Sequence, residues 1–171
     1  SRFKYFLSQE LKVPIKEINT TVLGGHGDTM VPMPNLTTIK GKTLKQFVEE
    51  NNISQDKLNS LIDRTRKGGA EIVKYLVKGS AFYAPAASGI EMADSYIKNL
   101  KKTLPCAAYL NGEYGVKNLY AGVPVVIGSK GVEKVVELSL DQNERKNFDQ
   151  SIRAVTELFE AAKKIDPDLK K

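Results

Sequence analysis

Residues 23–32 read Leu23-Gly24-Gly25-His26-Gly27-Asp28-Thr29-Met30-Val31-Pro32, and they hold the only histidine of the sequence. β-Branched residues from Ile18 onward lead into the glycines, which predicts a strand that runs into a loop. Glycine permits backbone angles that other residues avoid, and it lets a ligand approach closely. Histidine is the side chain best suited to exchange a proton near neutral pH. The stretch therefore indicates a histidine held for proton transfer, while a structural role for a single histidine stays open.

The residues before this loop predict a helix. Phe3, Phe6 and Leu7 share one helical face. Pro14 ends the pattern, because proline disfavours helical geometry in the residue before it. No capping residue precedes the helix, so we expect it to begin before Ser1, in a longer chain.

The residues after the loop predict an extended segment and several helices. Prolines interrupt the extended segment over 30–39, which indicates an edge strand or a bulge. A short helix is expected over 44–48, and a longer one, opened by Pro85, over 85–100.

The longest of these central helices is expected to run from Ser54, its cap, to Val77. Gly68 and Gly69 lie in its interior, where each glycine costs about 1 kcal/mol relative to alanine. A kink, or the close approach of another group, would account for the pair.

The last third of the chain predicts three strands, over 104–110, 121–127 and 132–140. The turn residues 128–131 make the last two a hairpin. Asp141 with Glu144 forms a capping box for a final helix that ends near residues 166–167. Strands and helices do not alternate regularly, so the prediction is an α+β domain in which antiparallel strands pack with long helices.

Composition narrows the class of protein. The 171 residues suit one domain, and no run approaches the roughly 18 consecutive apolar residues of a membrane span. The net charge is +6, but the lysines are dispersed among acids and are not interleaved with aromatics, so we expect neither a nucleic-acid partner nor a membrane. The positive charge could attract a dianionic substrate instead.

The single cysteine, Cys106, can form no internal disulfide, which fits a reducing compartment such as the cytoplasm. Its apolar neighbours indicate a small buried hydrophobic residue. One histidine and one cysteine leave no spacing for a zinc site, and we expect no metal.

The stretch 23–32 resembles the active-site segment of the lactate/malate dehydrogenase family. Further segments resemble that family in the same order, so the resemblance covers essentially the whole chain: residues 2–7, 64–73, 79–87 and 122–128. Within the family, the chain is most similar to malate dehydrogenases of the lactate-dehydrogenase-like type. Lactate dehydrogenases more often have glutamate at Gly25 and usually have threonine near Ala81.

The resemblance implies roles for two residues. His26 would be the general acid and base that exchanges the proton of the C2 hydroxyl when malate and oxaloacetate interconvert. Arg2, 24 residues earlier, would clamp the C1 carboxylate with its planar guanidinium. The aspartate that orients this histidine in the family would fall before Ser1.

The resemblance also implies what lies outside these residues. Residues 1–171 would be a C-terminal substrate-binding and catalytic domain, without the Gly-x-Gly-x-x-Gly turn of a dinucleotide site. NAD would be bound mainly by an N-terminal Rossmann domain, so we expect the 171 residues alone to be inactive. A homodimer or homotetramer is implied as well.

Several weaker candidate site residues have both a structural and a functional interpretation. Asp28 is interpreted as a loop-stabilising residue and less readily as a partner of His26. Ser80 and Ser88 could face the substrate, although loop or helix-cap hydrogen bonds are favoured. Tyr83 is expected in the core and not at the cofactor.

Arg64 and Arg66 are expected in surface or interface ion pairs. The alternative functions are half of a lactate or other 2-hydroxy-acid dehydrogenase, and a non-catalytic oligomerisation domain with the same fold.

Overall fold

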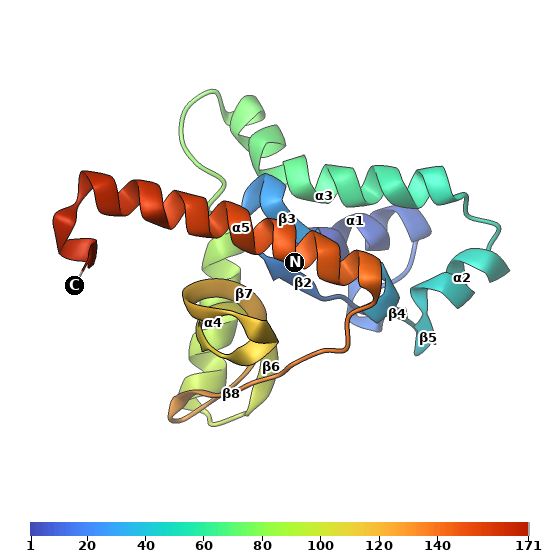
Figure 1. Cartoon of the computed structure of the whole chain (residues 1–171). Helices are drawn as coiled ribbons and strands as arrows, with labels where there is room; N and C mark the ends of the chain where they lie inside the picture. Colours follow the sequence, from blue (N-terminus) through green and yellow to red (C-terminus); the bar gives the residue numbers. More distant parts are fainter. Residues whose placement is uncertain (171) are drawn as a thin grey trace.

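A computed structural model describes residues 1–170 of the chain (Figure 1). Helices and strands alternate irregularly, and every strand pairing among these residues is antiparallel, which confirms the predicted α+β class. Short 3-10 turns join several of the elements. The main elements are α1 (Arg2–Leu11), β1 (Ile18–Asn19), β2 (Val22–Gly24), β3 (Met30–Pro32), β4 (Thr38–Ile39), β5 (Lys42–Thr43), α2 (Leu44–Glu50), α3 (Gln55–Leu76), α4 (Tyr83–Ile97), β6 (Lys102–Asn111), β7 (Lys117–Gly128), β8 (Gly131–Val135) and α5 (Gln142–Ile165).

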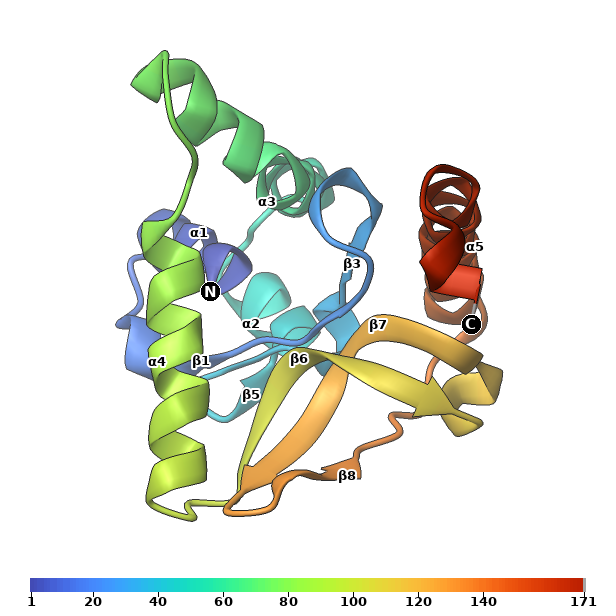
Figure 2. The same ribbon diagram turned by 90° about the vertical axis from the view of Figure 1, so that its left-hand side faces the viewer.

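The strands form two sheets. The larger has the order β3-β2-β7-β6, with β8 also paired to β7, and the smaller has the order β1-β4-β5. Gly128 pairs with Gly131, so the predicted hairpin is confirmed. Figure 2 shows α4 and α5 on opposite sides of the long β6–β7 hairpin, with α3 in the upper part of the view between them.

Two hydrophobic clusters hold these layers together. The first lies between the larger sheet and α5, where Phe148 packs against the strands that carry Leu23 and Val123. The second joins α1, α2 and α3 through residues such as Phe3 and Leu58. The loop after β2 packs against both α3 and α5.

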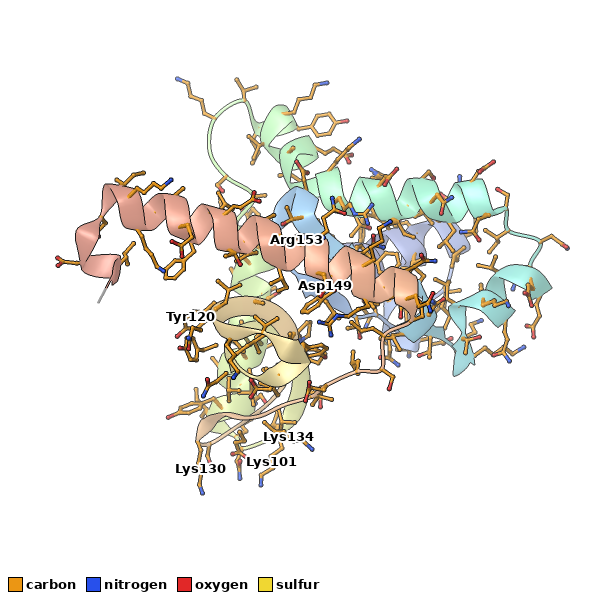
Figure 3. All side chains as sticks on the ribbon, viewed as in Figure 1. Lys101, Tyr120, Lys130, Lys134, Asp149 and Arg153 are labelled. Carbon is orange, nitrogen blue, oxygen red and sulfur yellow. The ribbon has the colours of Figure 1, made fainter. Side chains whose placement is uncertain are left out.

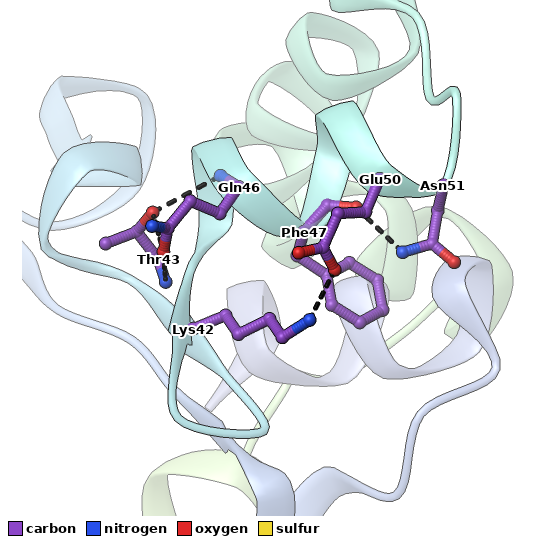
Figure 4. Close-up of polar contacts among 6 residues, drawn as sticks. All are labelled: Lys42, Thr43, Gln46, Phe47, Glu50 and Asn51. Atoms are coloured by element: carbon purple, nitrogen blue, oxygen red, sulfur yellow. Dashed lines mark hydrogen bonds and ion pairs between the residues drawn. The ribbon is translucent and has the colours of Figure 1, made fainter.

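Local signals placed the starts of α3 and α5 correctly, whereas the helix expected to open at Pro85 begins two residues earlier, at Tyr83. Ser54 caps α3 by accepting a hydrogen bond from the backbone of Lys57. Asp141 and Glu144 form the predicted capping box of α5. A further box, shown in Figure 4, joins Thr43 and Gln46 at the start of α2.

The strand predictions were too long in two places. The strand expected from Ile18 to Leu23 is split, because β1 pairs with β4 whereas β2 pairs with β3 and β7. The strand expected over 132–140 ends at Val135. Beyond it, the chain is held by the hydroxyl of Tyr114, which donates to the carbonyl of Val136 and accepts from the N–H of Leu138.

Of two burial predictions, that for Tyr83 was wrong and that for Cys106 holds in part. Tyr83 is 83% exposed, because it starts α4 beyond the edge of the core. Cys106 is only half-buried in β6, against the thioether of Met92, and this partial burial raises the pKa of its thiol. Within residues 1–170, none of the helices is both long and apolar enough to cross a membrane.

Candidate active site

His26 lies in the loop between β2 and β3, with its side chain exposed. Gly24 and Gly27 on either side have φ angles of 83° and 75°, which non-glycine residues rarely adopt. The loop then makes one 3-10 turn, in which the hydroxyl of Thr29 donates to the carbonyl of His26 over 3.3 Å. Within the described part of the chain no hydrogen bond reaches the imidazole, so the ring is available to a ligand.

A buried serine on α5 holds this loop at both ends. The Ser151 hydroxyl accepts from the backbone N–H of Gly25 at 2.8 Å, and it donates to the carbonyl of Thr29 at 2.5 Å. Sequence analysis missed Ser151. The available signal was a small polar residue on the apolar stripe of the final helix, beside Phe148, Ile152 and Val155.

The loop-stabilising role predicted for Asp28 is filled by these other residues. Asp28 is exposed, and its carboxylate hydrogen-bonds to nothing else between residues 1 and 170. Thr29 and Ser151 make the bonds that stabilise the loop. The alternative of a pair between Asp28 and His26 is not formed either.

Arg2 is the first residue of α1, and its side chain lies along α3. Nη1 of Arg2 donates to the carbonyl of Thr65 at 3.4 Å. A Cβ on Gly68 would lie 3.0 Å from Cδ of Arg2, and a Cβ on Gly69 would lie 3.3 Å from Nη2. The expected close approach is confirmed: the guanidinium of Arg2 approaches Gly69, and the stem of the same side chain, with the ring of Phe6, approaches Gly68.

The same part of α3 also supports the histidine loop. The turn Gly27–Thr29 and β3 both pack against α3 (Figure 2), and Nε of Arg66 donates to the carbonyl of Met30 at 3.3 Å. Arg2 therefore reaches α3 from α1 while the His26 loop reaches it from the sheet. One helix holds the two residues that the sequence singled out.

The arginines near this place differ in their pairing. Arg64 forms a two-bonded ion pair with Glu71, which holds the pKa of that carboxyl below its ordinary value, and Arg66 pairs with Asp63. The predicted ion pairs are thus confirmed. Across residues 1–170, Arg2 makes no such pair with a carboxylate, which leaves its guanidinium free to bind an anion.

Other cations lie elsewhere. Figure 3 shows Lys101, Lys130 and Lys134 gathered around the turn between β7 and β8, at the end of the molecule away from α3. Lys101 is paired there with Glu133 at 3.7 Å. The lysines of this turn therefore add little to the positive charge at the candidate site, where Arg2 and Arg66 lie.

The two serines of the sequence analysis cap no helix. Ser80 precedes α4, whose N-cap is Phe82, and Ser88 lies inside that helix. Ser88 lines a cavity of about 620 Å³ whose described lining includes neither Arg2 nor His26. The favoured helix-cap interpretation of these serines was wrong.

The strand pairing and the loop after β2 differ from those of a dinucleotide site. Such sites form at the carboxyl ends of parallel strands, beside a glycine-rich turn and a helix N-terminus. Strand pairs are antiparallel throughout residues 1–170, and the loop after β2 leads through one 3-10 turn into β3 and not into an α-helix. These residues do not fit NAD as its main binding platform.

The fold is similar to those of solved dehydrogenases. Malate dehydrogenase from Cryptosporidium parvum superposes with a TM-score of 0.93 at 44% identity, over 95% of this chain and 52% of that one. Lactate dehydrogenase from Eimeria maxima, solved with NADH and oxamate, gives a TM-score of 0.92 at 38% identity, over 97% of this chain and 52% of that one.

Sequence comparison agrees with the fold. The chain is 63% identical to a malate dehydrogenase of Pelagibacter ubique (strain HTCC1062) over all of its length, and 51% identical over 99% of its length to one of Methylobacterium radiotolerans. It covers 53% of each of these relatives, which is about half their length. The family model for the lactate/malate dehydrogenase α/β C-terminal domain matches residues 1–165, so the chain belongs to the lactate/malate dehydrogenase family and carries its C-terminal domain.

Proposed function

We propose that this domain is the catalytic half of an NAD-dependent malate dehydrogenase, which interconverts (S)-malate and oxaloacetate. His26 exchanges the proton of the C2 hydroxyl, and Arg2 binds the C1 carboxylate. The observation that carries this proposal is the common support of both residues by α3, at Thr65 to Gly69 for Arg2 and at Arg66 for the His26 loop.

The chemistry of each group suits its role. An exposed imidazole with no competing partner in the described chain takes the hydroxyl proton in the oxidation and returns it in the reduction. A guanidinium binds both oxygens of a carboxylate at once, which fixes the orientation of the substrate in a way that lysine does not. Together they place C2 beside the proton acceptor.

NAD supplies the hydride acceptor of this reaction when it is bound. We propose that a Rossmann domain preceding these residues in the full-length protein holds it, together with the aspartate that orients His26. The coverage of about half of each relative supports this division of roles. Residues 1–171 would then form the substrate-binding domain.

Malate is favoured over lactate as the substrate. The curated relatives named malate dehydrogenase are 63% and 51% identical, whereas the lactate dehydrogenase from Eimeria maxima is 38% identical. Lactate remains the second candidate, because that enzyme has nearly the same fold. Turnover of oxaloacetate and pyruvate by the full-length protein tests the choice: we expect oxaloacetate to be reduced more efficiently by at least about a hundredfold, and a preference for pyruvate would contradict it.

We further propose a cytoplasmic homodimer or homotetramer. The lone Cys106 fits a reducing compartment. Apolar side chains such as Ile90 and Ile97 are 70% and 76% exposed on α4, which supports contact with a further domain or subunit.

A further inference from the structure

We propose that Ser151 is a positioning residue for His26, acting from α5 through the backbone of the histidine loop. This inference rests on the proposed role of His26 in proton transfer. Ser151 would touch neither substrate nor cofactor. Its part would be to set where the imidazole stands when malate or oxaloacetate is bound.

The hydroxyl of Ser151 joins the two ends of the loop. It accepts from the N–H of Gly25, the residue just before His26, and it donates to the carbonyl of Thr29, where the turn after His26 closes. One hydroxyl thereby fixes the backbone on both sides of the histidine. Ser151 is 4% exposed, so water does not readily replace these bonds.

The glycines of the loop are explained by this contact. A Cβ on Gly24 would overlap the Ser151 hydroxyl, and a Cβ on Gly25 would overlap the side chain of Thr29 and approach Val155 at 3.0 Å. The two glycines allow the loop to lie directly on α5. The loop is therefore seated on a long helix, although its residues lie more than 120 positions away in sequence.

Among residues 1–170, Ser151 is the one side chain of α5 that hydrogen-bonds to the loop, which is otherwise closed by the pairing of Gly24 with Met30. The Thr29 hydroxyl bonds only within the turn, to the carbonyl of His26, and Arg66 reaches the carbonyl of Met30 from the α3 side. Loss of the Ser151 bonds would let the loop shift away from α5. A misplacement of about 1 Å in a catalytic group can cost about a hundredfold in rate.

Ser95 provides a matched control. It is also buried, its hydroxyl donates to the carbonyl of Ile127 at 2.7 Å, and it accepts from the N–H of Lys102 at 3.2 Å. Its bonds join α4 to the sheet, far in sequence from the loop. Ser95→Ala removes the same kind of group as Ser151→Ala and leaves the loop unchanged.

The experiment compares three variants of the full-length protein: Ser151→Ala, Ser95→Ala and His26→Asn. Steady-state kinetics give kcat and KM for oxaloacetate, fluorescence titration gives the affinity for NADH, and thermal unfolding gives Tm. We expect Ser151→Ala to lower kcat by about 10- to 100-fold with the affinity for NADH unchanged. Ser151→Ala and Ser95→Ala should lower Tm by similar amounts, because each loses two buried hydrogen bonds. Ser95→Ala should keep kcat within about twofold, because its bonds are only structural.

A merely structural role of Ser151 would make the two serine variants alike. Equal kcat values for Ser151→Ala and Ser95→Ala, with His26→Asn inactive, would overturn the positioning role and leave the proposed function standing. Retained turnover in His26→Asn would instead overturn the proposed function. If Ser151→Ala does not fold, Ser151→Cys and Ser95→Cys, whose thiols are weaker hydrogen-bonding groups, are compared by the same criterion.

Discussion

The guanidinium of Arg2 lies against the backbone of Gly69, so closely that a Cβ on Gly69 would stand 3.3 Å from Nη2 and 3.4 Å from Nη1. The neighbouring Gly68 leaves similar room for the stem of the same side chain. The two glycines therefore let Arg2 lie flat along a continuous helix. This contact explains why the helix contains two residues that lower its stability, which the sequence alone left unexplained.

Gly69→Ala should displace the guanidinium and weaken the clamp. We expect KM for oxaloacetate to rise by about tenfold or more in the full-length protein, since a charged hydrogen bond contributes about 1.5–3 kcal/mol. The affinity for NADH should not change. Steady-state kinetics and an NADH titration measure both quantities.

Gly89→Ala is the control for that substitution. Gly89 also lies inside a helix, α4, and a Cβ there would meet nothing within 4 Å. Both alanines raise helix propensity, so neither should lower Tm appreciably. An unchanged KM in Gly69→Ala would mean that the glycine does not serve the clamp.

Tyr114→Phe should destabilise the domain without touching the site. The buried hydroxyl of Tyr114 donates to the carbonyl of Val136 at 2.7 Å and accepts from the N–H of Leu138 at 3.0 Å. We expect the free energy of unfolding to fall by about 1–3 kcal/mol, because the N–H and the carbonyl lose their partner. Urea unfolding measures the change, and Tyr120→Phe, on an exposed tyrosine, should change it far less.

The same tyrosine gives a pH dependence. Burial raises the pKa of Tyr114 above its ordinary value of 10.0. A group whose pKa is raised by folding stabilises the protein fully below its unfolded pKa, and this stabilisation is lost as the pH rises through the folded pKa. Wild type should therefore lose more stability above about pH 10 than Tyr114→Phe does. Parallel pH profiles of the two proteins would count against this account.

The isolated 171-residue chain should show negligible NAD-dependent oxidation of malate. Its described strands are all antiparallel and form no dinucleotide platform. A coupled absorbance assay of NADH formation on the purified chain measures this. Appreciable turnover would place the cofactor site within these residues and refute the proposed division into two domains.

Sequence patterns predicted those parts of the fold that depend on local chemistry. The cap at Ser54 and the box at Asp141 and Glu144 involve residues three positions apart, and both helices begin where expected. The turn between Gly128 and Gly131 is equally local. His26 and Arg2 were proposed from motifs, since each lies in a segment that resembles one family.

Long-range contacts were not predictable in the same way. Nothing near Ser151 in sequence indicates a bond to Gly25, because the two meet only after α5 has packed on the sheet. Nor did the apolar pattern distinguish core from exposed surface. Tyr83 and Ile97 belong to an apolar helix, and yet both side chains are exposed in the described part of the chain. The glycine pair in α3 was noticed, but its partner Arg2 required the structure.

The central claim is that His26 is the proton-transfer residue, and His26→Asn in the full-length protein tests it most directly. Asparagine preserves much of the size and polarity of histidine but does not exchange a proton near neutral pH. The account predicts that kcat for oxaloacetate reduction collapses by about a thousandfold while the affinity for NADH stays nearly intact. A variant that retains even about a tenth of wild-type turnover would contradict it, since general acid–base catalysis contributes about 100- to 10,000-fold.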